Sequence, residues 1–281
     1  MHKIDQILTC WVVALNPEGI GIREKYKMKS VTHNAPFPIF SNDLGSDWLI
    51  VSGIGRANVA AATMCLYHVS NAPAWTVWIN IGIAGHCKND FGSLYLIDKI
   101  TEEATGLQSY PRPAIISNIP KSSLFTVDLP KKNYKSGYLF DMEGSAFFNI
   151  ACQLSCQQLV LMLKVVSDSP DYSFMDLTKK IISDLITLQI DKITDTVEKM
   201  RMVAREEANR LKLPEPYNEI INAWHFSTFQ MHQLQHLLRC WIIHFPEHNI
   251  MDVLTSCRNA NKVLECLSNK LDRNLIDWDK S

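Results

Sequence analysis

Two carboxylic acids stand where predicted buried strands end. Glu143 follows the apolar residues 138–140, and Asp168 closes the mainly apolar segment 161–168. In an α/β sheet, side chains at the carboxyl ends of strands face the crevice in which such folds bind ligands. Both acids are therefore candidates for direct contact with a polar small molecule.

Two glycine segments lie close to other strand ends. Residues 52–55 read Ser-Gly-Ile-Gly between a predicted strand and an alanine-rich helical pattern, and residues 82–85 read Gly-Ile-Ala-Gly. At such a turn, backbone N–H groups and a helix amino terminus can face a polar ligand. Glycines also let a strand turn tightly into a helix with no ligand present, so the segments alone leave both interpretations open.

Composition limits the class of protein. The chain has 281 residues, 47% of them hydrophobic, and a formal net charge of -1. It can therefore bury one full core and an appendage, and it lacks the basic stripe that nucleic-acid binding requires. We find no signal peptide, no membrane-spanning run and no Cys-x-x-Cys pair among the eight cysteines, so we expect a cytoplasmic protein with reduced thiols and no membrane partner.

Apolar runs alternate with helical patterns, which predicts an α/β sheet with helices on both faces. The expected helices cover residues 57–67 and 142–156, and a long helical pattern follows over 174–211. The expected strands cover residues 7–15, 48–51, 76–83, 94–97, 138–141 and 159–166.

A proline-containing break at residues 212–216 predicts a domain boundary. We expect a domain over 1–211 and a helical extension of two or three amphipathic helices over 212–281, which either packs on the core or binds a protein partner.

His232 and His236 are spaced as a metal pair on one helix face. The Glu of a His-Glu-x-x-His pattern is missing, so we expect neither a metal nor a cofactor.

Four segments carry a resemblance to a known family. Residues 52–62, 79–85, 140–146 and 165–171 occur in the order seen in the nucleoside phosphorylase superfamily, and they most resemble the methylthioadenosine/S-adenosylhomocysteine nucleosidase branch. The resemblance covers roughly residues 5 to 205. It implies a twisted mixed β-sheet flanked by helices, activity on N-ribosides, and often a homodimer.

The resemblance also implies roles for individual residues. Glu143 would accept hydrogen bonds from the ribose hydroxyls, with Met142 against the sugar, and Asp168, presented by Ser167, would serve N7 of a purine. Cleavage of an N-glycosidic bond passes through an oxocarbenium-like sugar while electrons flow into the base. One acid must therefore serve the leaving base, and a carboxylate near the ribose stabilises the developing positive charge.

The choice between hydrolysis and phosphorolysis depends on a third acid. Glu18 is in register with the glutamate that activates water in the nucleosidases, so it is the candidate general base. Asn80 stands where phosphorolytic relatives carry a phosphate-binding arginine. Arg23 and Arg56 lie near the relevant turns and keep phosphorolysis open.

The backbone and hydroxyl groups around the glycine segments complete the expected substrate site. They belong to Ser52, Gly53 and Gly82, and Ser52 is expected to hold the water or the sugar.

Each acid also has an explanation without a substrate. Glu18 fits a solvated turn, Glu143 a helix amino end, and Asp168 a helix cap. The order of the four segments nevertheless favours a nucleosidase that releases a purine from a 5′-modified nucleoside such as methylthioadenosine or S-adenosylhomocysteine. The alternatives are a phosphate-dependent nucleoside phosphorylase and a catalytically silent module that binds a nucleoside or a partner.

Overall fold

The computed structural model describes residues 7–32, 34–87, 91–130, 137–170 and 172–272. The chain divides into two compact units, Met1–Arg210 and Leu211–Ser281, and each is described by itself. Within the described ranges, no helix combines the length and apolar character needed to cross a lipid bilayer.

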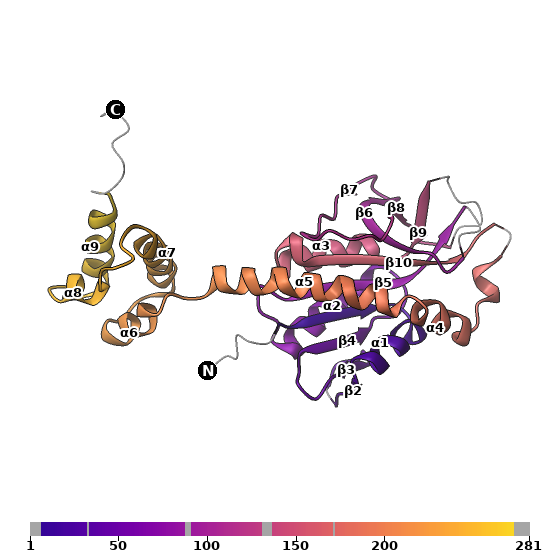
Figure 1. The fold of residues 1–281 in the computed structure, drawn as a ribbon, viewed down its shortest axis with the longest axis horizontal. Helices are drawn as coiled ribbons and strands as arrows, with labels where there is room; N and C mark the ends of the chain where they lie inside the picture. Colours follow the sequence, from indigo (N-terminus) through magenta and orange to yellow (C-terminus); the bar gives the residue numbers. More distant parts are fainter. Residues whose placement is uncertain (1–6, 33, 88–90, 131–136, 171, 273–281) are drawn as a thin grey trace. The chain divides into compact units, whose positions relative to one another are not determined.

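The first unit is built on one mixed sheet (Figure 1). Its centre is parallel: β1 (Thr9–Val13) lies between β4 (Asp47–Val51) and β5 (Val77–His86), and β5 also pairs in parallel with β10 (Val160–Asp168). The remaining strands are β2 (Lys29–Ser30), β3 (Ile39–Ser41), β6 (Leu94–Glu102), β7 (Gln108–Ser109), β8 (Lys121–Thr126) and β9 (Tyr138–Asp141). Parallel and antiparallel pairs both occur, which confirms the predicted mixed sheet.

Half of the sheet closes on itself. Strands β5, β10, β6, β8 and β9 pair in that order, and β9 returns to β5 at Gly85 and His86. β9 runs opposite to β5 and β10, yet its carboxyl end meets theirs because it pairs only with the last two residues of β5. The ends of β1, β5, β9 and β10 therefore lie together.

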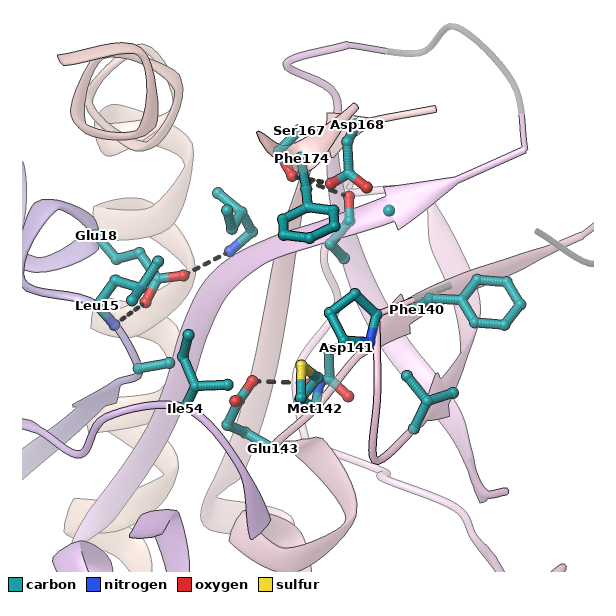
Figure 2. Close-up of a pocket in the computed structure, with 16 residues that line it drawn as sticks. Leu15, Glu18, Ile54, Phe140, Asp141, Met142, Glu143, Ser167, Asp168 and Phe174 are labelled. Atoms are coloured by element: carbon teal, nitrogen blue, oxygen red, sulfur yellow. Dashed lines mark hydrogen bonds between the residues drawn. The ribbon is translucent and has the colours of Figure 1, made fainter. Parts of the chain in front are cut away.

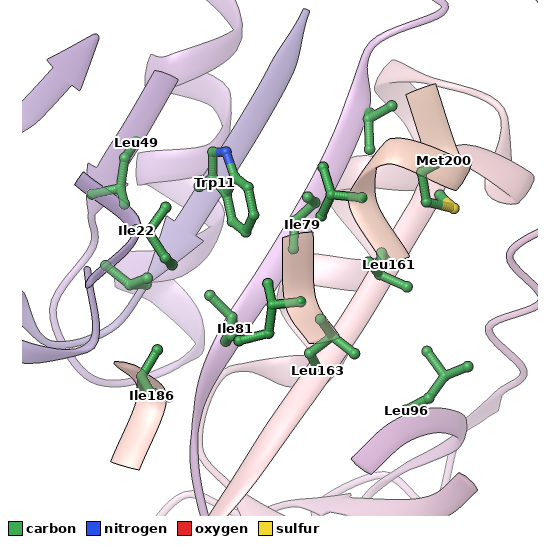
Figure 3. Packing of buried hydrophobic residues seen from close by; sticks show 14 of the residues in the cluster. Trp11, Ile22, Leu49, Ile79, Ile81, Leu96, Leu161, Leu163, Ile186 and Met200 are labelled. Carbon is green, nitrogen blue, oxygen red and sulfur yellow. The ribbon is translucent and has the colours of Figure 1, made fainter. Parts of the chain in front are cut away.

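Two apolar cores sandwich the sheet, because alternate residues of each strand face opposite sides. On one side, shown in Figure 3, Trp11, Ile79 and Leu161 pack with Ile186 and Met200. The helices of this side are α1 (Ile20–Lys25), α4 (Lys179–Thr187) and α5 (Ile190–Leu211). The opposite core joins the sheet to α2 (Arg56–Ser70) and α3 (Gly144–Leu154). The prediction of helices on both faces is confirmed.

Two details of the first unit differ from the prediction. Residues 82–85 are not a turn, because β5 continues through them to His86. The single helical pattern over 174–211 is divided into a short 3₁₀ turn (Phe174–Asp176), α4 and α5. Thr178 caps α4 by accepting a hydrogen bond from the Ile181 N–H, and Gln189, between α4 and α5, donates to the Gly92 carbonyl oxygen at 2.8 Å. The apolar periodicity of this segment predicts one helix, but the cap at Thr178 and the contact of Gln189 coincide with its division into shorter helices.

The second unit is helical, as predicted, with its own core of Leu234, Leu238, Trp241, Val263 and Leu267 among others. Its described residues form four helices rather than two or three: α6 (Pro216–Ala223), α7 (Thr228–His244), α8 (Ile250–Leu254) and α9 (Ala260–Asp272). The extra boundaries arise because Ser227 and Asn249 accept hydrogen bonds from the first turns of α7 and α8.

Candidate functional site

A pocket opens in the first unit where the ends of β1, β5, β9 and β10 meet. Figure 2 shows Glu18, Glu143 and Asp168 around it, each from a different part of the chain. The rest of its lining is mainly apolar: Ala14, Leu15, Ile54, Ile83, Ala84, Gly85, Val127, Pro130, Phe140, Asp141, Met142, Ser167 and Phe174. The three sequence-predicted acids therefore share one largely apolar site.

Glu18 lies in the 3₁₀ turn Asn16–Gly19 that follows β1, and only 2% of it is exposed. Its carboxylate accepts hydrogen bonds from the N–H groups of Leu15 at 2.7 Å and Ile83 at 2.9 Å. Burial raises the pKa of this carboxyl, against the opposing effect of these N–H groups and the Lys164 charge. Glu18 is therefore not a solvated turn residue, and its environment suits a proton acceptor.

Gly82 makes room for Glu18. A Cβ atom at position 82 would lie 2.8 Å from Oε1 of Glu18, closer than real Cβ atoms approach other atoms. The glycine therefore lets the carboxylate lie directly against β5. Gly82 does not line the pocket itself.

Glu143 occupies the turn between β9 and α3. Its Oε1 accepts a 2.6 Å hydrogen bond from the Gly55 N–H, and Oε2 accepts one from the Met142 N–H at 3.3 Å. Burial, together with the nearby Asp141 charge, raises the pKa of Glu143 to about 7. Its side chain makes no capping hydrogen bond to α3, so the helix does not account for its position.

Asp168 is the last residue of β10, just after an irregularity in the β10–β5 register. The Ser167 hydroxyl donates to its Oδ1 at 2.5 Å (Figure 2). Asp168 caps no helix, because Ser173 and Thr178 cap the next two helical segments. Asp171, which belongs to the same sequence motif, lies outside the described residues.

The predicted substrate-binding residues Ser52 and Gly53 do not line the pocket. The Ser52 hydroxyl lies 3.2 Å from the Val13 carbonyl oxygen and 2.8 Å from that of Gly53, so it is engaged by the backbone. Met142 and Ser167, by contrast, do line the pocket.

The two candidate anion-binding arginines are engaged elsewhere. Arg56 pairs with Glu102 and, at 2.7 Å, with Asp128, while Arg23 lies over the Phe40 ring and donates to the Gly19 carbonyl oxygen. Asn80 is buried in β5 and donates to the Val12 carbonyl oxygen at 3.1 Å. Among the described residues that line the pocket there is no arginine or lysine.

Sequence reasoning missed an ion pair beneath the pocket. Lys164, inside β10, places its Nζ 2.8 Å from Oδ2 of Asp141, and both side chains are almost fully buried. The signal was present, because a lysine within an apolar strand must find a buried partner. Phe140 and Phe174 in the lining were also missed, since apolar residues at strand and turn positions have no distinctive pattern.

His232 and His236 both lie on α7 of the second unit. His236 lies 3.8 Å from the Cys240 sulfur, and the described part of the chain contains no cluster of three or more metal-ligating side chains. All eight cysteines are free thiols.

The fold is shared with solved nucleosidases. A 5′-methylthioadenosine/S-adenosylhomocysteine nucleosidase from Helicobacter pylori aligns with a TM-score of 0.55 and 10% identity, over 69% of this chain and 98% of that one. The corresponding enzyme from Colwellia psychrerythraea gives a TM-score of 0.51 and 17% identity, over 66% and 96%. A 5′-methylthioadenosine nucleosidase from Arabidopsis thaliana gives 0.53 and 16%, over 71% and 96%.

By sequence, no protein-family model and no curated protein matches the chain. At these identities the likeness concerns the fold. The first unit therefore has the nucleoside phosphorylase-like fold of the 5′-methylthioadenosine/S-adenosylhomocysteine nucleosidases.

Proposed function

We propose that the first unit is an N-ribosyl hydrolase that releases the base from a purine nucleoside. The observation that carries the proposal is the convergence of Glu18, Glu143 and Asp168 on one mainly apolar pocket of a nucleosidase-like fold. An apolar surround strengthens electrostatic interactions, so carboxylates there act more strongly on a developing positive charge than they would in water.

The three acids have complementary tasks in the proposed reaction. Glu143 accepts hydrogen bonds from the ribose hydroxyls and stabilises the oxocarbenium-like sugar. Asp168 gives a proton or a hydrogen bond to N7 as electrons flow into the base, and the Ser167 hydroxyl holds its carboxyl group in place. Glu18 takes a proton from the water that attacks the anomeric carbon. Two backbone N–H groups orient the Glu18 carboxylate for this step.

The surroundings favour water over phosphate as the nucleophile. A phosphate clamp needs cationic donors, and arginine is the usual choice because its fork matches phosphate. Arg56 is neutralised by Glu102 and Asp128, and Arg23 is held against Phe40. Hydrolysis is therefore the proposed reaction, with phosphorolysis as the rival.

An apolar part of the lining supports a nucleoside whose 5′ substituent begins with an apolar thioether. Leu15, Ile54 and Phe174 line the pocket together with the acids. The related H. pylori enzyme was solved with butyl-thio-DADMe-Immucillin-A, and the C. psychrerythraea enzyme with adenine. We propose a 5′-modified adenosine, such as methylthioadenosine or S-adenosylhomocysteine, as the substrate. On the same resemblance we propose a homodimer, which analytical ultracentrifugation can test. We also propose a cytoplasmic location, because the cysteine pattern of the sequence is typical of a reducing compartment.

Base release from methylthioadenosine, S-adenosylhomocysteine, adenosine, inosine and a pyrimidine nucleoside, with and without phosphate, tests the proposal. Phosphate-independent release of adenine supports it. Dependence on phosphate moves the function to phosphorolysis. A folded protein that is thermally stabilised by a nucleoside but releases no base is a binding module instead.

A further inference from the structure

Lys164 is a buried cation that the proposed mechanism does not use. Only 2% of its side chain is exposed, and it lies in the middle of β10 between Leu163 and Val165. It does not line the pocket. Burying a charge is costly unless the charge is paired and hydrogen-bonded, so the position of Lys164 requires a partner.

That partner, Asp141, organises the turn that carries Glu143. Its Oδ2 accepts hydrogen bonds from the Lys164 ammonium at 2.8 Å and from the Gly144 N–H at 2.9 Å. Its Oδ1 accepts one from the Thr126 hydroxyl at 2.8 Å, and the Thr126 oxygen accepts one from the Ser145 N–H at 3.0 Å. Asp141 therefore holds both ends of the two-residue turn Met142–Glu143.

Lys164 contacts the Asp141 carboxylate directly and interacts electrostatically with the carboxylates of Glu143 and Glu18 as well. They come from three different elements, namely β9, the turn before α3, and the 3₁₀ turn after β1. Burial alone would lower the pKa of Lys164, but the three carboxylates outweigh burial and raise it. The ammonium group therefore remains charged inside the sheet.

The strand register places Lys164 beside the part of β5 against which Glu18 lies. Lys164 pairs with Gly82 across the β10–β5 ladder, and the Glu18 carboxylate lies against Gly82. The charge of Lys164 thus acts on both the acid proposed to activate water and the acid proposed to bind the sugar.

We propose that Lys164 is a positioning residue: through Asp141 it fixes the Met142–Glu143 turn that presents the carboxylate to the sugar, and its positive charge favours the ionised form of that carboxylate. The catalytic consequence rests on the proposed hydrolase function. The effect on the ionisation of Glu143 does not, so the two can be tested separately.

Three influences raise the pKa of Glu143 to about 7, namely burial, the Asp141 charge and, least, the Glu18 charge. The charge of Lys164 and the hydrogen bond from the Gly55 N–H oppose them. Replacing the lysine with a neutral side chain raises the pKa of Glu143 further. Glu143 is then protonated at a higher pH, and the acidic limb of the activity profile moves upward by about one pH unit.

The test compares Lys164→Met, Lys164→Arg and Lys180→Met. Lys164→Met removes the charge while keeping an unbranched side chain, Lys164→Arg keeps the charge, and Lys180, 87% exposed on α4, is the surface control. The measurements are kcat and KM for base release across pH, and the titration of the Glu143 carboxyl carbon by ¹³C NMR, with the signal assigned by Glu143→Gln.

We expect Lys164→Met to lower kcat at least tenfold with less change in KM, and to shift both the acidic limb and the Glu143 titration to higher pH. Lys164→Arg retains the wild-type profile, and Lys180→Met matches wild type. If Lys164→Met does not fold, Lys164→Met with Asp141→Asn leaves no unpaired charge. That pair keeps the low kcat but shifts the titration less, because an opposing charge is removed as well.

A folded Lys164→Met variant with the wild-type kcat and an unchanged Glu143 titration overturns the inference. If the wild-type protein releases no base, the proposed hydrolase function fails. The NMR titration still decides whether Lys164 controls the ionisation of Glu143.

Discussion

Gly55 and Glu143, 88 positions apart in the chain, are joined by a 2.6 Å hydrogen bond from the Gly55 N–H to Oε1 of the carboxylate. Gly55 has a φ of 100° and a ψ of 156° just before α2, a conformation essentially restricted to glycine. The first glycine segment therefore acts as a backbone donor to a candidate catalytic acid. Such a glycine turn can form for backbone reasons alone, but here its N–H also holds a carboxylate of the candidate site.

We predict that Gly55→Ala loosens Glu143. The substitution forces a side chain into a strained backbone conformation, at a cost of about 1 to 3 kcal/mol in unfolding free energy. The Gly55 N–H then shifts away from the carboxylate, and kcat for base release falls about tenfold or more. Denaturant unfolding and steady-state kinetics measure the two effects.

Gly45→Ala is the matched control. Gly45 also has a positive φ, 69°, and nothing lies within 4 Å of a Cβ built there. It sits between β3 and β4 and does not line the pocket. Comparable destabilisation with full activity is expected for this control. Equal losses of activity in the two variants would show that the Gly55 effect is only loss of stability.

Asp168→Asn tests the acid assigned to the leaving base. Asparagine keeps the size of the side chain and can still accept the Ser167 hydrogen bond, so we expect an unchanged melting temperature. General acid catalysis contributes roughly 10²- to 10⁴-fold, and base release should fall by this factor. Retained turnover in Asp168→Asn would remove this residue from the mechanism.

Glu143→Gln should change how stability depends on pH. The pKa of Glu143 is raised from 4.5 to about 7 in the folded protein, so the folded state binds this proton more tightly than the unfolded chain does. As the pH rises from about 4.5 to about 7, the wild type loses up to about 3 kcal/mol of unfolding free energy relative to Glu143→Gln.

Urea unfolding of the wild type and Glu143→Gln at pH 4 and pH 8 measures this difference. The glutamine variant gains relative stability at pH 8 while losing base release. A stability difference that is the same at both pH values would contradict the raised pKa.

Glu18→Gln addresses the proposed activation of water. The amide oxygen can still accept one N–H hydrogen bond, but it cannot take a proton, so turnover should fall by roughly 10²- to 10⁴-fold. Binding of a nucleoside analogue should persist, because the assigned sugar and base contacts come from Glu143 and Asp168. Calorimetric titration separates the two effects, and undiminished turnover would rule out Glu18 as the base.

Much of the site was predictable because it follows directly from strand ends. Glu143 and Asp168 each follow a recognisable apolar strand, and the structure brings them to one pocket as expected. Glu18 required the resemblance, because a turn carrying Pro17 and a glutamate has no distinctive local pattern.

The parts that sequence reasoning missed depend on pairings across the sheet. Gly82 looked like part of a turn, but it lies inside β5, where it makes room for a carboxylate from another segment. Lys164 and Asp141 are 23 positions apart in the chain, and only the closure of β9 and β10 around β5 brings them to 2.8 Å. The local hydrophobic periodicity of the sequence does not predict which residues come together across the sheet.

The origin of the anomeric oxygen on the released sugar tests the proposed hydrolysis most directly. The wild-type protein is incubated with methylthioadenosine in ¹⁸O-labelled water, with and without phosphate. The masses of the products are then measured by mass spectrometry. Hydrolysis gives free adenine and a 5-methylthioribose that carries one ¹⁸O atom, at a rate that phosphate does not change. A sugar 1-phosphate formed only when phosphate is present, with no ¹⁸O incorporation, would contradict it.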